Sequence, residues 1–314
     1  MQIGKTAKAG RTFTVNRQKA NRSETIASYL MLSPQIIGFL VFTIYPILWV
    51  YRYSVYDYDG LNTVFVGLEN FKRLFTRDPQ YWSSLLNTFI IAYGKLIVEL
   101  PLALIVAVIL NEKVLGRNFF RVMFFMPNII STAVIGLVFT FIFSTFNGAA
   151  NNLLISLGVL DQPYNWFANK WSSMMVIMLA SIWQGFGANV LFILAGLQNI
   201  PTDLYEAAEI DGASRWKQFL HVTVPMLAPV LQIILMLAMV NGMKIMDLVM
   251  VLTNGAPAGE TNVVMLYIYK FFFEDGSTVK QYGYASALGV VTSIIICAAT
   301  LLYLKVSKKS SSVY

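Results

Sequence analysis

Six long apolar segments, separated by polar stretches, dominate the hydropathy pattern of this 314-residue chain. Each is close to or longer than the roughly 20 residues that an α-helix needs to cross the hydrocarbon core of a bilayer. The segments are continuously apolar, which favours helices over the alternating strands of a membrane β-barrel. The pattern therefore predicts an all-α, polytopic membrane protein with six transmembrane helices, at residues 29–53, 84–110, 118–145, 173–197, 226–252 and 283–305.

The polar ends and loops predict how the chain is placed in the membrane. We expect a basic N-terminal tail over residues 1–28, a six-helix membrane domain over residues 29–305 and a short tail over residues 306–314. If both termini are cytoplasmic, the segments inside the cell hold about twice as many Lys and Arg residues as those outside, in agreement with the positive-inside rule. The sequence thus predicts cytoplasmic N- and C-termini.

The loop between the fourth and fifth spans differs from the others. Residues 198–225 are long, charged and rich in helix-forming residues. Asp203 and Glu206 have the spacing of a capping box, which predicts a helix start, and Gly212 can adopt the positive φ that ends a helix. We therefore expect two short helices joined by an elbow at Gly212. The acids of this loop are Asp203, Glu206, Glu209 and Asp211.

The second short helix has signals of its own. Ser214 is placed to accept a hydrogen bond from the backbone of the first turn. Pro225 should end this helix and open the fifth span, since proline has no N–H to donate and is favoured in the first turn of a helix. Such a polar loop can be a solvated connection or a docking surface for a soluble protein, and the residues alone leave both readings open.

Composition excludes several classes of function. Hydrophobic residues make up 57% of the chain and charged residues 12%, far below the roughly 25% of a soluble domain. The single histidine, His221, rules out a multi-histidine metal site, and the single cysteine, Cys297, rules out an intrachain disulfide. The net charge of +7 comes from basic residues near loop ends, which favours membrane orientation over nucleic-acid binding. We expect no catalytic site, no metal and no cofactor in this chain.

Charged and amide residues within the spans are candidates for function, because polar groups at membrane depth are costly. Lys95 and Glu99 lie four residues apart on one face of the second span. They can form a self-neutralising structural pair or can contact a polar substrate. Asn241, Lys244 and Asp247 follow at helical spacing in the fifth span, where they can form a seam against another subunit or line a cavity.

The polar loop also resembles a known signature. Glu206-Ala207-Ala208, then Gly212 after three residues, then Val222-Thr223-Val224-Pro225 after nine more resemble the EAA motif of ABC importer permeases. Other segments resemble the carbohydrate branch of that family, whose members are similar to the maltose and glycerol-phosphate permeases. These segments are 67–71, Asn87-Thr88, 119–121, Met126-Pro127, 253–257 and 282–287.

The resemblance implies a division of labour among several subunits. This chain would be a multi-pass permease of a bacterial cell membrane, paired with a second, homologous permease as a heterodimer. Two ATP-binding subunits would hold ATP and Mg²⁺, and a solute-binding protein outside the membrane would deliver a carbohydrate. Loop 198–225 would carry the coupling helix that contacts an ATP-binding subunit, through Glu206, Ala207, Ala208, Asp211, Gly212 and Pro225.

Polar and small residues of spans three to five are the candidates for the path of the solute. Side chains that form hydrogen bonds suit a hydroxyl-rich solute. The candidate path residues are Asn128, Thr132, Gln184, Gly185, Asn241, Gly242 and Lys244.

Other functions stay open on the sequence. A stand-alone secondary transporter could use Lys95, Glu99, Lys244 and Asp247 to relay ions or protons. A membrane-embedded enzyme has little support, since Asp247 has no obvious acidic partner. Within the importer family, an amino-acid or phosphate importer is an alternative to a carbohydrate importer. For a carbohydrate importer, a neutral oligosaccharide, an acidic oligosaccharide and glycerol phosphate all remain open as solutes.

Overall fold

The computed structural model describes residues 22–112, 114–273 and 280–311. Most of the expected basic tail therefore lies outside the described residues. The chain divides into two compact units, residues 1–49 and 50–314, and each is described by itself.

The described part of the first unit is helical and contains a π-helical turn. Helix α1 (Arg22–Phe39) leads into the turn η1 (Leu40–Ile44) and then into α2 (Tyr45–Tyr53), whose last residues belong to the second unit. The turn ends two residues before Pro46, and the N–H of Tyr45 bonds to the carbonyl of Leu40. The wider turn relieves the clash of a proline ring with the carbonyl four residues before it. The apolar stretch Ile26–Tyr53 is therefore helical throughout and long enough to cross a membrane.

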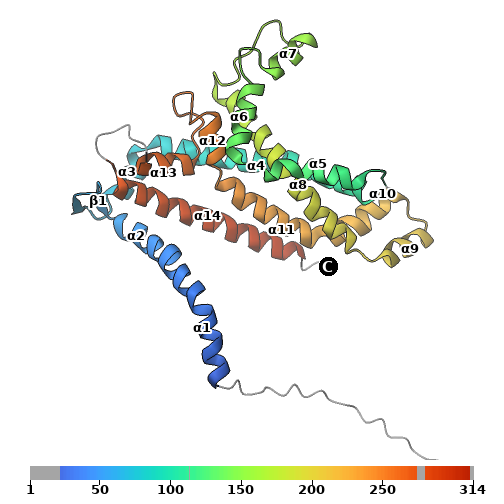
Figure 1. The fold of residues 1–314 in the computed structure, drawn as a ribbon, viewed down its shortest axis with the longest axis horizontal. Coiled ribbons are helices and arrows are strands. Elements are labelled where there is room, and N and C mark those ends of the chain that lie inside the picture. Colours follow the sequence, from blue (N-terminus) through green and yellow to red (C-terminus); the bar gives the residue numbers. More distant parts are fainter. Residues whose placement is uncertain (1–21, 113, 274–279, 312–314) are drawn as a thin grey trace, which may run out of the picture. The chain divides into compact units, whose positions relative to one another are not determined.

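The second unit is built almost entirely of helices (Figure 1). Its two short strands, β1 (Tyr56–Tyr58) and β2 (Thr63–Phe65), pair antiparallel, and the connection turns at Gly60 with φ +101°. In chain order the helices are α3 (Glu69–Arg77), α4 (Pro79–Asn111), α5 (Arg117–Ile129), α6 (Thr132–Ile142), α7 (Ala149–Ser156), α8 (Lys170–Gln198), α9 (Thr202–Ile210), α10 (Arg215–Gln218), the π-helical turn η2 (Phe219–Thr223), α11 (Val224–Met243), α12 (Asp247–Leu252), α13 (Val264–Phe273) and α14 (Tyr282–Ser311).

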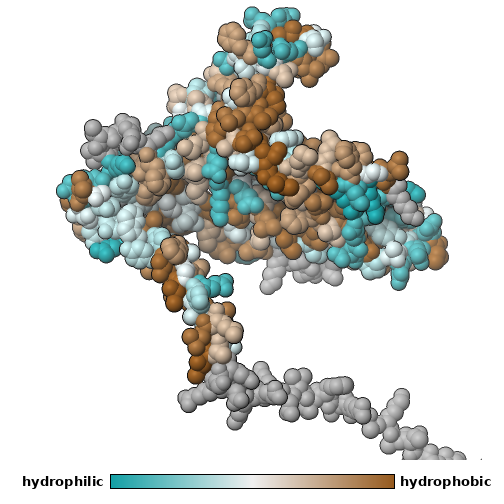
Figure 2. Space-filling model, viewed as in Figure 1, coloured by the Kyte–Doolittle hydropathy of each residue, from teal (hydrophilic) through white to brown (hydrophobic). Residues whose placement is uncertain are grey.

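The expected fold class is confirmed. Among the described residues, five helices are long and apolar enough to cross a membrane, and there are six such spans if α5 and α6 are counted as one broken span. Apolar side chains cover much of the outer surface of the second unit, and hydrophilic ones gather toward the ends of its long helices (Figure 2). On α5, for example, Phe119, Val122 and Ile129 are each more than half exposed. Such a surface fits lipid or another membrane subunit and would be a liability in water.

Helices α4 and α8 form the centre of the second unit. They pack along each other, while α5 packs on α8, α11 on α4, and α6 on α12 (Figure 1). Glycines set the closest approaches: a Cβ at Gly187 of α8 would overlap the backbone oxygen of Phe124 in α5. The two helices can touch there only because residue 187 has no side chain.

The third expected span, 118–145, is not one continuous helix. Helices α5 and α6 are bent by 98° at a short break, where Ile130 and Ser131 have extended backbone angles. The residues around the break are polar, and Asn, Ser and Thr side chains offer the backbone alternatives to the helical ladder. Asn128, near the end of α5, donates its amide across to the backbone oxygen of Gln184 in α8 at 3.4 Å.

The fifth expected span, 226–252, is also interrupted. Helix α11 ends at Met243 and α12 begins at Asp247, so Asn241, Lys244 and Asp247 do not share one continuous helix as their spacing predicted. Gly242 lies against α4, where a Cβ would be 2.9 Å from that of Ala92. Glycine is a weak helix former. Gly242, at its close contact with Ala92 of α4, therefore favours the end of α11 at Met243.

A buried carboxylate joins the elements at one end of the second unit. Asp78 caps α4 by accepting from the N–H of Tyr81 at 3.0 Å, and it also accepts from the hydroxyls of Tyr267 in α13 and Tyr284 in α14. Burial, together with the neighbouring carboxylate, raises the pKa of Tyr267 well above its usual value, so this phenol stays protonated and can donate. One side chain thus fixes α13 and α14 to the start of α4.

The contact at Gly187 gives a test of this packing. Replacing Gly187 with Ala should destabilise the protein by about 1–3 kcal/mol, because the added methyl group must push α5 away from α8. The measurement is the thermal unfolding midpoint of the purified protein in detergent. As a control, Gly38→Ala adds a methyl group where no atom lies within 4 Å and should leave the midpoint unchanged or raise it. Equal midpoints for Gly187→Ala and the unmodified protein would contradict the packing described here.

Candidate functional site

The loop 198–225 folds as the expected pair of short helices, but the first helix begins differently. Pro201 is the N-cap residue of α9, Thr202 is its first residue, and no side chain caps the helix. Asp203 lies inside the first turn, so the expected capping box of Asp203 and Glu206 is wrong. The carboxylate of Asp203 still lies near the positive end of the helix dipole, where an acid is favourable.

The elbow forms at Gly212, as expected. Gly212 has φ +76°, its N–H bonds to the carbonyl of Glu209 at 3.0 Å, and the N–H of Ala213 bonds to the carbonyl of Ala208 at 2.9 Å. This pair of bonds is a Schellman motif, which satisfies the last carbonyls of α9 and fixes the direction of the chain after it. The angle between the two short helices is therefore set by the backbone.

The second short helix continues into a long span without a break. Ser214 caps α10, as expected, by accepting from the N–H of Lys217. The expectation that Pro225 ends this helix is wrong, because α10 passes through η2 into α11, and Arg215–Met243 forms one helical stretch. Pro225 lies in the first turn of α11, two residues after the π-helical turn, as Pro46 does after η1. The elbow is therefore joined to a full-length membrane helix.

The residues of the EAA signature lie on α9, at the elbow after it, in η2 and in the first turn of α11. Glu206, Ala207, Asp211 and Gly212 are exposed, while Ala208 and Pro225 are half-buried. Glu206 forms no ion pair within the described part of the chain. Apolar side chains are exposed beside it, with Ile210 87% and Leu204 40% accessible. Exposed acidic and apolar side chains therefore lie next to each other on α9.

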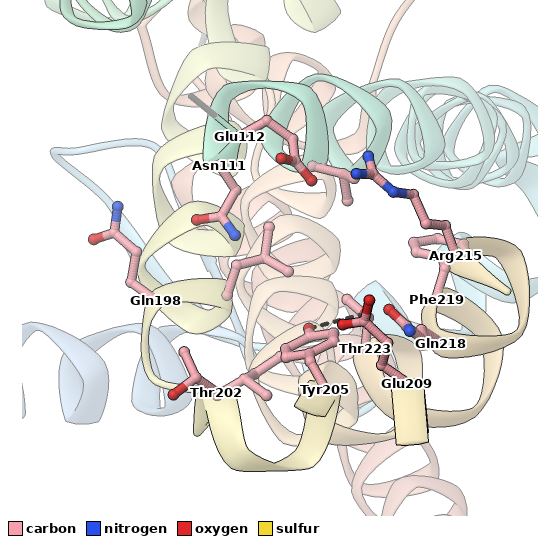
Figure 3. A pocket seen from close by; sticks show the side chains of 13 residues that line it. Asn111, Glu112, Gln198, Thr202, Tyr205, Glu209, Arg215, Gln218, Phe219 and Thr223 are labelled. Atoms are coloured by element: carbon pink, nitrogen blue, oxygen red, sulfur yellow. Dashed lines mark hydrogen bonds between the residues drawn. The ribbon is translucent and has the colours of Figure 1, made fainter. Parts of the chain in front are cut away.

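The inward face of α9 borders a cavity of about 690 Å³ (Figure 3). The hydroxyls of Tyr205 and Thr223 bond across it at 3.0 Å and join α9 to η2. Tyr205 also packs on the buried cluster that holds the ends of α4, α8 and α11. Helix α9 is thus attached to the membrane helices by its two chain connections and by Tyr205.

A second cavity, of about 260 Å³, lies within the membrane helices at the two breaks. Its lining includes every candidate path residue, namely Asn128, Thr132, Gln184, Gly185, Asn241, Gly242 and Lys244, together with Lys95, Ser181 and Asp247. Residues from α4, α5, α6, α8 and the break after α11 therefore meet at one place. The fold brings together side chains that are up to 153 residues apart in sequence, from Lys95 to Leu248.

Hydrogen bonds hold part of this lining in place. The amide of Gln184 donates to the hydroxyl of Thr132 at 3.0 Å, which fixes α8 to the start of α6. Amide, hydroxyl and ammonium groups face a small space that interrupted helices surround. Irregular backbone is tolerated at membrane depth where it lines such a cavity, and hydrogen-bonding groups there suit a polar solute.

Lys95 and Glu99 form the expected pair, with Nζ and Oε2 3.6 Å apart. Ser181 and Asn189 of α8 complete the pair, and the sequence reasoning missed both: Lys95 donates to Ser181 Oγ at 3.1 Å and Asn189 donates to Glu99 Oε1 at 2.7 Å. Gly185 provides the space, since a Cβ there would lie 2.6 Å from Glu99 Oε1. Ser181 and Asn189 lie eight residues apart, on one face of α8 with Gly185 midway between them, and this spacing is the feature that could have revealed the polar stripe.

Comparison with known proteins decides the family. Residues 99–311 match the family described as binding-protein-dependent transport system inner membrane component. The chain belongs to this family. The match covers the elbow, the spans α8, α11 and α14, and the lining of both cavities except Lys95, and the expected resemblance to ABC importer permeases is confirmed.

Individual relatives of the chain can be aligned with it over nearly its whole length. The arabinooligosaccharides transport system permease protein of Bacillus subtilis strain 168 is 36% identical over 91% of this chain and 90% of its own. The trehalose/maltose permease protein of Thermococcus litoralis is 32% identical over 92% and 96%, and the lactose permease protein of Rhizobium radiobacter is 32% identical over 93% and 97%. Its fold is that of a permease in a solved bacterial alginate ABC transporter, with a TM-score of 0.79, 22% identity and coverage of 91% of this chain and 96% of that one.

The elbow at Gly212 gives a test of the loop. Gly212→Val should weaken α9 by roughly 1–2 kcal/mol, because an L-residue with a branched side chain is strained at positive φ. The measurement is the rate of proteolysis within loop 198–225 in the folded protein, which should rise. Gly212→Asn is the matched control, since asparagine tolerates the left-handed region and no atom lies within 4 Å to clash with it. A Gly212→Val variant that resists proteolysis as well as the Asn variant would contradict the role of the elbow.

Proposed function

We propose that this chain is the permease subunit of an ATP-driven importer that carries an oligosaccharide or a related sugar into the cell. The observation that carries the proposal is the cavity at the two helix breaks, which is lined by hydrogen-bonding side chains and lies in the same helices as an exposed EAA loop. The sugars in the names of the relatives support the substrate class: arabinooligosaccharides, trehalose or maltose, and lactose.

The partners follow from the family and from the exposed surfaces. The exposed face of α9 docks on one of two ATP-binding subunits, which bind ATP and Mg²⁺ and perform the hydrolysis. The apolar outside of the spans is covered by lipid and by a second, homologous permease. A solute-binding protein delivers the sugar at the opposite side of the membrane. A related bacterial alginate ABC transporter, solved in complex with a periplasmic protein that holds an alginate pentasaccharide, supports this last partner.

The orientation in this proposal places both termini and loop 198–225 in the cytoplasm of a bacterial cell. The excess of Lys and Arg in the segments on that side supports it. The elbow then transmits motion, because α9 is joined through a fixed backbone angle to α10, η2 and α11. When the ATP-binding subunits close, they move α9, and α11 moves with it beside the cavity at its end.

The proposed docking of Glu206 gives a direct test. Glu206→Lys should reduce capture of the ATP-binding subunits by the tagged chain at least tenfold and abolish sugar import, since it reverses the charge of an exposed acid at the contact. The measurements are co-purification from cells that express the neighbouring transport genes, and uptake of labelled arabinotriose, maltose and lactose. Asp161→Lys is the control, because this exposed acid lies in the loop before α8, at the other end of the span from α9, and should leave capture unchanged.

A Glu206→Lys variant that captures the ATP-binding subunits normally and imports sugar at the normal rate would overturn the coupling role of α9. Failure of the unmodified chain to capture any ATP-binding subunit would overturn the proposed function itself.

A further inference from the structure

The buried pair of Lys95 and Glu99 is placed asymmetrically with respect to the intramembrane cavity. Lys95 lines the cavity, with 11% of its side chain accessible. Glu99 does not line it, is only 1% accessible and lies on the next turn of α4 behind Gly185. A pair whose only role was to neutralise two charges would not need one member at the cavity wall. The position of Lys95 points to a contact with the solute.

The hydrogen bonds of the pair leave donors of Lys95 available. An ammonium group has three N–H donors. The structure gives one of them to Ser181 Oγ at 3.1 Å, and Glu99 Oε2, at 3.6 Å, lies beyond hydrogen-bond distance. Glu99 Oε2 itself has no hydrogen-bond partner, although it is fully buried. The carboxylate therefore acts on Lys95 mainly through its charge.

Glu99 is held rigidly where it is. Asn189 donates to its Oε1 at 2.7 Å, and the missing side chain of Gly185 leaves the space that the carboxylate fills. A fixed negative charge directly behind Lys95 holds the ammonium group at this part of the wall. Glu99 is thus a positioning residue for Lys95.

The charges around the cavity balance. Lys95 and Lys244 are the two cations of the lining, and Asp247 lines it as well. With the Glu99 carboxylate behind the wall, two positive and two negative charges surround the space, and the remaining polar lining consists of amides and hydroxyls. A balanced set of charges attracts an acidic solute no better than a neutral one, whereas hydrogen-bond donors suit the hydroxyl and ring oxygens of an uncharged sugar.

We propose that Lys95 is a hydrogen-bond donor to an uncharged saccharide in the transport cavity, and that Glu99 and Asn189 position it for this contact. The inference rests on the proposed function and goes beyond it, because it assigns the contact to a residue of α4 and excludes an acidic sugar as the preferred solute.

Two double variants distinguish a contact between Lys95 and the sugar from a purely structural role of the charged pair. Lys95→Gln with Glu99→Gln removes both charges but keeps a donor at the cavity, whereas Lys95→Met with Glu99→Gln removes the charges and the donor together. Neither leaves a lone buried charge, which would destabilise the helix bundle whatever the role of the pair. Each is tested in the reconstituted complex with its ATP-binding subunits and binding protein. Import of arabinotriose, maltose or lactose is measured per ATP hydrolysed, alongside the thermal unfolding midpoint.

We expect the Gln/Gln variant to import within about threefold of the unmodified complex and the Met/Gln variant to lose at least tenfold, with similar unfolding midpoints and ATP hydrolysis in both. Ser84→Ala is the control, since Ser84 is buried in α4, bonds only within that helix and lies away from the cavity. It should leave import per ATP unchanged.

The other outcomes overturn the proposal. Equal import by the two double variants at the normal rate would mean that Lys95 makes no contact with the sugar. Equal loss with intact midpoints would mean that the charge itself is needed, as for an acidic solute. If both double variants lose import equally and their thermal unfolding midpoints fall, the pair of Lys95 and Glu99 has only a structural role. If the unmodified complex imports none of the three sugars, the result counts against the proposed function, because the double variants then have no import to be compared with.

Discussion

The structure depends on the requirement that polar groups at membrane depth find their partners within the protein. A long helix meets this requirement for its own backbone, and for that reason five uninterrupted helices carry most of the apolar sequence. At the α5–α6 break, side chains bond across to α8: Asn128 donates to the backbone oxygen of Gln184, and the side chain of Gln184 donates to the hydroxyl of Thr132. Residues of this break and of the break after α11 line the same cavity.

The same requirement explains the chemistry of the cavity wall. Lys95 and Glu99 can be buried together because each offsets the charge of the other, and Ser181 and Asn189 of α8 each form one hydrogen bond with the pair. The small residues Gly185 and Gly242 belong to this arrangement: one makes room for the Glu99 carboxylate and the other lets α11 approach Ala92. Gly185 and Gly242, which the sequence offered as candidate path residues, thus also allow the close packing that forms the cavity wall.

Loop 198–225 follows local rules instead. Its elbow is a Schellman motif at Gly212, and a serine cap starts the next helix, so its shape is set within a few residues. Helix α10 continues through η2 into α11 without a break, so the elbow is joined to the helix that ends at the cavity.

The sequence by itself determined the features that depend on near neighbours: the apolar spans, the elbow at Gly212, the Ser214 cap and the family, because hydropathy, backbone angles and motif spacing act over a few residues. It also identified the seven candidate path residues, but it could not show that they share one cavity. The breaks in spans three and five, the absent capping box and the continuous helix through Pro225 were decided by tertiary contacts. Ser181 and Asn189 became partners of the charged pair only when α8 packed along α4, because a side chain separated by many residues contributes only where the fold places it.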